Sequence, residues 1–273
     1  MPSPTPLPSP PKPTSDAPHT ARAALIAAAV LVAGGLAVWL ALPAPSLPVL
    51  GAVPSFTLVE FAVRGERVLQ VGHLERFNPA VLAIEGLVTQ PRFIECHRLA
   101  PFTERGTDVD VVLDLMIHDL DVILSMVQSP LRSVEAVGVP VLTPSVDIAN
   151  ARLRFANGCI ANVTASRVSL KRERKLRIFQ ADAYLAVDYG ERRVRICRRE
   201  PDADGQAALT LEEREVPEGD ALEAEIDAFL RAVRAREAPA VSGWDGLRAL
   251  EVAHVIRESL ESEVRAVQAA PAS

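Results

Sequence analysis

Apolar and polar positions alternate regularly from Glu66 to the C-terminus, and this pattern predicts an α+β domain. Strand-like runs with a period of two recur at short intervals, which is typical of an antiparallel sheet. These runs cover residues 68–72, 92–99, 131–139, 147–155, 159–168, 175–178, 183–188, 192–197 and 208–216. Helical spacing covers residues 80–88, 110–127, 220–234 and 244–267. The order of these elements indicates a largely antiparallel open sheet with helices on one face.

The first part of the chain has a different pattern. Residues 1–22 are rich in proline, which removes backbone donors and favours an extended or disordered segment. Residues 23–42 carry no charge, and one apolar helix of that length would cross roughly 30 Å of hydrocarbon. Residues 43–65 contain further prolines and form a predicted linker to one large domain over residues 66–273.

The apolar stretch 23–42 admits three interpretations. Its length favours a single membrane-spanning helix, with Trp39 near one end where an interfacial aromatic is expected. A secretory signal is the second interpretation, because Ala41-Leu42-Pro43-Ala44 resembles a small-residue cleavage site. A mistranslated or rearranged 5′ end is the third. The first predicts a single-pass membrane location, and without that helix the expected location is cytoplasmic.

Composition and charge exclude several classes of protein. Hydrophobic residues make up 49% of the chain, enough for a substantial core. The formal net charge of -6 argues against nucleic acid as a partner, since phosphate binding needs a clustered positive surface. Cys96, Cys159 and Cys197 are widely spaced and form no C-x-x-C pair. We therefore expect no disulfide framework and no metal site, but reduced, buried thiols.

Asp114 and His118 are the most informative pair in the sequence. Residues four apart on a helix lie on one face, within reach of each other. A carboxylate that holds one imidazole nitrogen fixes the tautomer and raises the pKa, which suits the other nitrogen to proton transfer. The alternative is an ordinary surface pair, but the apolar residues 115–117 between the two favour a site. The sequence therefore predicts that His118 is a catalytic acid/base oriented by Asp114.

A family resemblance rests on three segments in a characteristic order and spacing. They read VLQVGHLERFNPAV, FIECHRLAPFTERGTDVDVVLDLMIHDLDVIL and ANGCIANVTASRVS. Over about residues 67–265 the chain resembles the Gfo/Idh/MocA oxidoreductases, most of all the branch acting on UDP-N-acetylglucosamine-type sugar nucleotides. The resemblance implies oxidation of a sugar hydroxyl with NAD or NADP. It also implies that His118 and Asp114 are the catalytic pair and that the open sheet forms a homo-oligomer.

The resemblance also implies residues that border the cofactor and the substrate. The family motif G-x-x-x-R-F-x-P falls on Gly72, Arg76, Phe77 and Pro79. All four are cofactor-binding candidates, and Arg76 is a substrate-binding candidate as well.

Basic side chains suggest where the phosphates of a sugar nucleotide would bind. Arg167, Lys171 and Arg172 follow a predicted strand and could contact phosphate oxygens. A salt bridge at the sheet edge is the alternative for Arg167. His97 is a further substrate-binding candidate, and Arg98 next to it could face the same cleft. The alternative is that His97 is satisfied by its neighbours, as a histidine on a strand commonly is.

The chain departs from the family pattern in its cofactor half. It contains no G-x-G-x-x-G fingerprint. The family's E-K-P motif is also absent, since Val59-Glu60-Phe61-Ala62 offers a glutamate without the lysine. Three hypotheses stay open. They are an NAD(P)-dependent sugar-nucleotide oxidoreductase, an inactive membrane-tethered module that binds sugar nucleotides, and a truncated or frameshifted gene product.

Overall fold

An eight-stranded sheet dominates the computed structural model, which describes residues 26–33, 36–43, 55–103, 109–201 and 207–269. Its strands are β4 (Pro91–Leu99), β5 (Leu131–Val139), β6 (Ile148–Phe155), β7 (Ile160–Ser166), β8 (Glu173–Gln180), β9 (Ala183–Asp188), β10 (Arg193–Pro201) and β11 (Ala207–Glu215). They lie in the order β11-β10-β9-β8-β4-β7-β6-β5. β4 and β7 are parallel and every other neighbouring pair is antiparallel.

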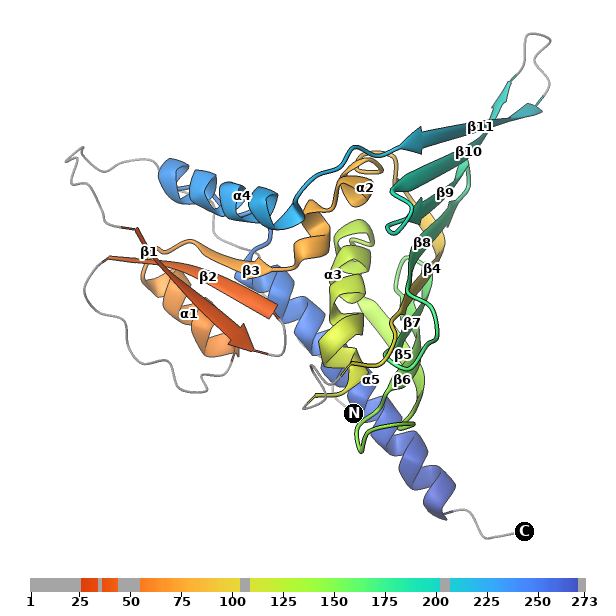
Figure 1. Cartoon of the computed structure of the whole chain (residues 1–273), viewed down its shortest axis with the longest axis horizontal. Helices are drawn as coiled ribbons and strands as arrows, with labels where there is room; N and C mark the ends of the chain where they lie inside the picture. Colours follow the sequence, from red (N-terminus) through yellow and green to blue (C-terminus); the bar gives the residue numbers. More distant parts are fainter. Residues whose placement is uncertain (1–25, 34–35, 44–54, 104–108, 202–206, 270–273) are drawn as a thin grey trace.

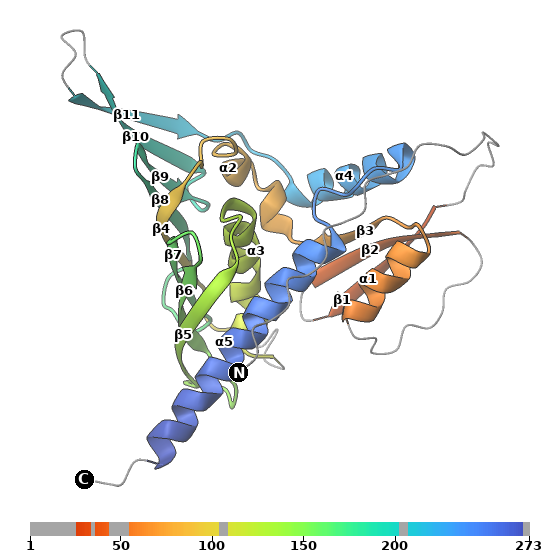
Figure 2. The ribbon, with the colours of Figure 1, turned by 180° about the vertical axis from the view of Figure 1, so that it is seen from behind.

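The helices that pack on the sheet all lie on one of its faces (Figures 1 and 2). The helical elements of this part are η1 (Leu74–Phe77), α2 (Pro79–Leu82), η2 (Val112–Met116), α3 (Ile117–Met126), α4 (Ala221–Ala235) and α5 (Gly243–Ala269). The α+β class and the open, largely antiparallel sheet are therefore confirmed. Helix α2 is shorter than expected and begins where the Asn78 side chain accepts the Ala80 N–H at 3.0 Å.

The main core lies between the inner face of the sheet and helices α3 and α5. Burial alternates along β6 and β9, as the period of two requires. Ile94, Leu153, Leu176 and Leu185 are fully buried on the sheet side of this core. Leu120 on α3 is also fully buried and belongs to the same cluster. The sheet thus gives α3 a rigid platform.

The apolar stretch near the N-terminus is not a helix. It contains strands β1 (Ile26–Ala33) and β2 (Leu36–Pro43), which pair antiparallel, and β2 also pairs with β3 (Leu69–Gly72). Two apolar runs flank a Gly-Gly dipeptide, which is a sequence signal for a two-residue hairpin loop. Among the described residues no helix is long and apolar enough to span a membrane. The predicted membrane-spanning helix, and the location that followed from it, are therefore wrong.

The expected linker also contains a helix, α1 (Ser55–Arg64). Its Val59 and Ala62 are buried against Leu69 of β3, because residues three apart share a helix face. Helix α1 also contacts α5 (Figure 2). The predicted proline-rich segment 1–22 lies outside the described residues.

Candidate active site

The predicted catalytic pair lies where a π-helical turn passes into α3. Asp114 is in the middle of η2, and His118 is in the first turn of α3. The turn begins at Asp110, whose side chain accepts the N–H groups of Val112 and Leu113 at 3.0 and 3.1 Å. A π-helical turn widens the helix locally and is frequent at functional sites.

The His118 imidazole is half-buried against a charged interior. Its Nδ1 is buried and has no hydrogen-bond partner among the described residues. Burial, reinforced by the nearby Arg98 cation, lowers the pKa of His118 to about 4. The ring is therefore neutral at pH 7 and can accept a proton.

The Asp114 carboxylate lies beside Arg167. It forms a long ion pair with Arg167 at 4.0 Å, and His118 Nδ1 donates no hydrogen bond to it. The prediction of a raised pKa for His118 is wrong, because burial and Arg98 dominate over any nearby carboxylate.

A buried network of charges lies beside His118 and joins four elements. Arg98 of β4 donates to both carboxylate oxygens of Asp119 on α3, at 2.8 and 2.7 Å. It also donates to Glu75 of η1 at 2.9 Å. Glu75 in turn accepts from Arg174 of β8 at 3.3 Å and from Asn78 at 3.0 Å. These paired charges hold the start of α3 against the sheet.

The network also sets its own charge state. Burial alone would raise the pKa of Glu75, but the Arg98 and Arg174 guanidiniums outweigh it and hold that pKa below its usual value. Burial likewise opposes the Arg98 cation, yet Asp119 and Glu75 raise the pKa of Arg98 well above its ordinary value. Glu75 and Arg98 therefore stay ionised near His118.

A second buried group lies on the other side of His118. The fully buried His73 contacts the His118 ring edge to face, with the ring centroids 5.9 Å apart. Its Nε2 is 3.9 Å from Asp121 Oδ1, and Arg76 approaches the same oxygen to 3.6 Å. Burial, then His118 and Arg76, lower the pKa of His73 to about 3.

Lowering the pH from about 6.5 to about 4 should destabilise the protein. In this window the unfolded chain binds protons at His73 and His118 that the folded protein does not, so stability rises with pH. Asp121 opposes this trend, since burial raises its pKa to about 7, but two imidazoles outweigh one carboxyl. Thermal denaturation across this range measures the slope.

Replacing His73 by glutamine should weaken that pH dependence by about 1.4 kcal/mol per pH unit. His254→Gln is the control, because His254 is exposed on α5 and should leave the slope unchanged. An unchanged slope in His73→Gln would contradict the buried, neutral state of His73.

The motif that borders cofactor and substrate forms a compact corner of the structure. Gly72 ends β3, Phe77 is buried at the end of η1, and Pro79 opens α2. Arg76 keeps about a fifth of its side chain exposed (21%) and donates weakly to Ala240 O at 3.5 Å. Arg76 is therefore partly exposed beside Asp121, where a bound molecule could contact it, whereas Phe77 is buried.

The predicted phosphate ligands separate into two kinds. Arg167 is buried, donates to Val109 O at 2.6 Å and lies 3.5 Å from Asp147. Lys171 and Arg172 are exposed in the connection between β7 and β8. Arg167 therefore joins loops inside the protein, whereas Lys171 and Arg172 face solvent.

His97 lies away from the candidate site. Successive side chains of a strand point to opposite faces, so His97 is on the outer face of β4 while Arg98 points inward. The His97 ring is 3.7 Å from Glu173 on that outer face. The structure does not bring it to His118.

Sequence reasoning missed four residues of this site, His73, Glu75, Asp119 and Asp121, and did not place Arg98 in a buried ion-pair network with them. One signal was available on β4, where Arg98 shares the period of Ile94 and Cys96 and so belongs to the buried face. The partners Glu75 and Asp119 carry no such signal, since they become neighbours only through the fold.

The described residues do not fit a dinucleotide. Strands β1, β2 and β3 pair antiparallel, whereas a dinucleotide fold needs parallel βαβ units. The glycines that begin α5 serve packing: a Cβ at Gly243 would lie 2.6 Å from Leu69, and one at Gly246 would lie 2.6 Å from Val71. We place no cofactor in this part of the chain.

The comparisons with known proteins agree on one family. The family model described as GFO/IDH/MocA C-terminal domain matches residues 80–185. UDP-N-acetylglucosamine 3-dehydrogenase of Acidithiobacillus ferrooxidans is 37% identical over 207 residues, which cover 75% of this chain and 66% of that protein. The chain belongs to the Gfo/Idh/MocA family. It spans slightly less than two thirds of the length of that relative.

Solved structures of Gfo/Idh/MocA dehydrogenases share this fold. UDP-N-acetylglucosamine 3-dehydrogenase GnnA from Acidithiobacillus ferrooxidans has a TM-score of 0.71 at 36% identity, covering 76% of this chain and 66% of that one. A levoglucosan dehydrogenase in complex with NADH and L-sorbose has a TM-score of 0.60 at 17% identity. That alignment covers 70% of this chain and 63% of the other, and at this identity it shows the fold alone.

Proposed function

We propose that this Gfo/Idh/MocA chain acts in the oxidation of a sugar-nucleotide hydroxyl, with a substrate of the UDP-N-acetylglucosamine type. The observation that carries the proposal is the half-buried, neutral His118 in the first turn of α3, directly after the π-helical turn η2 and beside a fixed network of ion pairs. The 37% identity to a UDP-N-acetylglucosamine 3-dehydrogenase supports the class of substrate.

His118 would remove the proton of the reacting hydroxyl. A neutral imidazole has a free lone pair, and a base positioned within hydrogen-bond reach contributes typically 10²–10⁴-fold to such a reaction. Arg98, Asp119 and Glu75 would keep the ring in place, because they tie the start of α3 to β4 and η1. Asp114 would position the turn from its ion pair with Arg167.

NAD or NADP is the hydride acceptor that the family relationship suggests for this reaction. The levoglucosan dehydrogenase of the same fold was solved with NADH. Because the described residues form no dinucleotide site, a second candidate function is a module that binds the sugar nucleotide without redox chemistry.

Isothermal titration of the full chain with UDP-N-acetylglucosamine tests the proposal. Binding together with NAD(P)-dependent turnover supports the oxidoreductase, whereas binding without turnover supports the module. Absence of binding would contradict both.

Lys171 and Arg172 are proposed to contact the phosphates, because both are exposed near Arg174 of the buried network. Losing one charge-assisted contact costs about 1.5 kcal/mol, so Lys171→Ala or Arg172→Ala should each weaken binding about tenfold. Arg199→Ala is the matched control, since Arg199 is exposed on β10, away from this connection. Equal affinities in all variants would contradict this placement.

A second copy of the chain is proposed to cover the open face of the sheet, which no described helix covers (Figures 1 and 2). A row of cross-strand neighbours there includes Phe93, Phe179 and Tyr184, with successive ring centroids 5.7 and 4.8 Å apart. The row continues to Leu211, which is 70% exposed. Such an apolar patch on a monomer marks an interaction surface.

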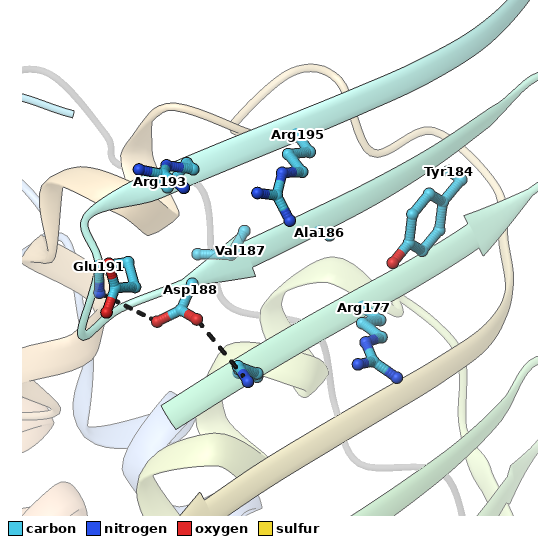
Figure 3. Close-up of a pocket in the computed structure, with 9 residues that line it drawn as sticks. Arg177, Tyr184, Ala186, Val187, Asp188, Glu191, Arg193 and Arg195 are labelled. Atoms are coloured by element: carbon cyan, nitrogen blue, oxygen red, sulfur yellow. Dashed lines mark hydrogen bonds and ion pairs between the residues drawn. The ribbon is translucent and has the colours of Figure 1, made fainter. Parts of the chain in front are cut away.

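Charges of both signs flank this row and suit a symmetric contact. Figure 3 shows Tyr184 on β9, with Arg177 and Arg195 on the strands to either side of β9. Each arginine has an acidic neighbour, Glu95 at 3.4 Å and Glu213 at 2.9 Å. A twofold axis can set the basic groups of one copy against the acidic groups of the other.

Introducing charge into the row should separate the copies. We expect Tyr184→Glu combined with Leu211→Glu to halve the mass measured by light scattering, with an unchanged circular dichroism spectrum. Leu170→Glu is the control, because Leu170 is 99% exposed outside the strands of this face. A wild-type chain that is monomeric at all concentrations would rule out this interface.

A further inference from the structure

His73 lies directly behind His118 and has no structural partner that explains it. It is fully buried, and the two imidazoles meet edge to face at 5.9 Å. Neither ring nitrogen of His73, nor the Nδ1 of His118, has a hydrogen-bond partner among the described residues. Buried polar atoms are normally paired, so three such nitrogens side by side call for a function.

Asp121 continues the row on the far side of His73. Its Oδ1 lies 3.9 Å from His73 Nε2, and its Oδ2 is buried without a hydrogen-bond partner in the described part of the chain. The Arg76 guanidinium is 3.6 Å from Oδ1 and is about one fifth exposed (21%). The groups therefore run from His118, through His73 and Asp121, to a cation at the surface.

We propose that His73 and Asp121 form an internal proton path that takes the substrate proton from His118 toward the surface beside Arg76. The path rests on the proposed function at its substrate end. The substrate O–H bond breaks as His118 binds that proton at one nitrogen and releases another proton from its second nitrogen. His73 does the same, and a new O–H bond forms at Asp121.

This sequence balances in atoms and charge. Each imidazole is neutral before and after the transfer, and the negative charge passes from the Asp121 carboxylate to the substrate oxygen. The separations in the row are longer than direct hydrogen bonds, so one bridging water or a ring rotation completes each contact during transfer. Water commonly bridges buried polar groups that lack direct partners.

The acidities along the row agree with this direction. Burial raises the pKa of Asp121 to about 7 and lowers the pKa values of His118 and His73 to about 4 and about 3. After the transfer the proton therefore rests on Asp121, and the two imidazoles only pass it along. The charged groups that face the row are Arg76 and Glu75 (η1), Arg98 (β4), Asp119 (α3), Arg174 (β8), and Asp245 and Arg248 (α5).

Nuclear magnetic resonance of the full chain with ¹⁵N-labelled histidine tests the path without substrate. We expect the side-chain signals of His73 and His118 to shift together near pH 7, as Asp121 takes up its proton. Asp121→Asn, which keeps the shape of the side chain, should abolish both shifts. Asp188→Asn on the outer face of the sheet is the control and should abolish neither.

His73→Gln separates a proton path from a simple field effect. The charge of Asp121 remains in this variant, but the connection to His118 is broken, so the His118 shift near pH 7 should disappear. Its persistence would overturn the path, as would wild-type signals that do not move between pH 5.5 and 8.5. If His73→Gln does not fold, His73→Asn takes its place, because it also breaks the connection to His118 and leaves the charge of Asp121 intact.

The two proposals fail separately. Coupled shifts without sugar-nucleotide binding would leave the path standing and remove the proposed substrate. Binding without coupled shifts would remove the path and leave the proposed function in place.

Discussion

Replacing Arg98 by methionine should lower the free energy of unfolding by about 3–5 kcal/mol, the usual cost of removing one partner from a buried ion pair. Arg98 is 4% exposed and pairs with two carboxylates that are themselves almost fully buried, Asp119 and Glu75. Without the guanidinium, both would remain in a poorly solvating interior with Arg174 as the remaining cation beside Glu75. Urea denaturation at pH 7 measures the loss.

Two further variants show whether the loss of stability comes from the stranded buried charges or from removing any arginine. Arg177→Met removes an exposed arginine that pairs with Glu95 at 3.4 Å, and it should change stability by less than about 1 kcal/mol. Adding Glu75→Gln and Asp119→Asn to Arg98→Met should recover much of the loss, because the stranded charges are gone. A loss below about 1 kcal/mol in Arg98→Met would show that the network contributes little.

Replacing Arg167 by methionine should destabilise the protein by about 2–4 kcal/mol, because a buried, paired cation with several acceptors is lost. Arg167 donates to the carbonyls of Val109 and Val146 at 2.6 and 3.3 Å. It also lies between the carboxylates of Asp114 and Asp147. The side chain thereby fixes the residues that lead into the π-helical turn below His118.

Arg172→Met is the matched control for this prediction. Arg172 is exposed a few residues away in the connection after β7. Its loss should therefore leave the free energy of unfolding within about 0.5 kcal/mol of wild type. If Arg167→Met kept wild-type stability and instead lost affinity for UDP-N-acetylglucosamine, Arg167 would be a phosphate ligand.

Periodicity located the strands and helices of the main sheet with small errors at their ends. Alternating burial on β6 and β9 follows from a side-chain period of two, which is a local property of the chain. The helical pattern extends beyond α2, because residues 83–88 keep a compatible spacing while residues 83–87 form turns after Leu82.

The apolar stretch near the N-terminus has no period that could identify its secondary structure. A continuous apolar run has no period, so it cannot separate a helix from two paired strands. Strand β2 finds its second partner in β3, about thirty residues further along the chain. The prolines before residue 55 favour a linker over a helix in this part of the sequence. The one local sign of helix α1 is the spacing of Val59 and Ala62, which places both on one buried face.

The candidate site also has one part that the sequence predicts and another that depends on the fold. The α+β class, the family and the spacing of Asp114 and His118 can be predicted from the sequence, because they depend on residue types and spacing within short segments. The surroundings of this pair depend on the tertiary fold: Arg98 meets Glu75 and Asp119 across 23 and 21 residues, and His73 reaches His118 from another part of the chain. It also reversed the expected pKa of His118, since burial is a property of the packed interior and no local pattern carries it.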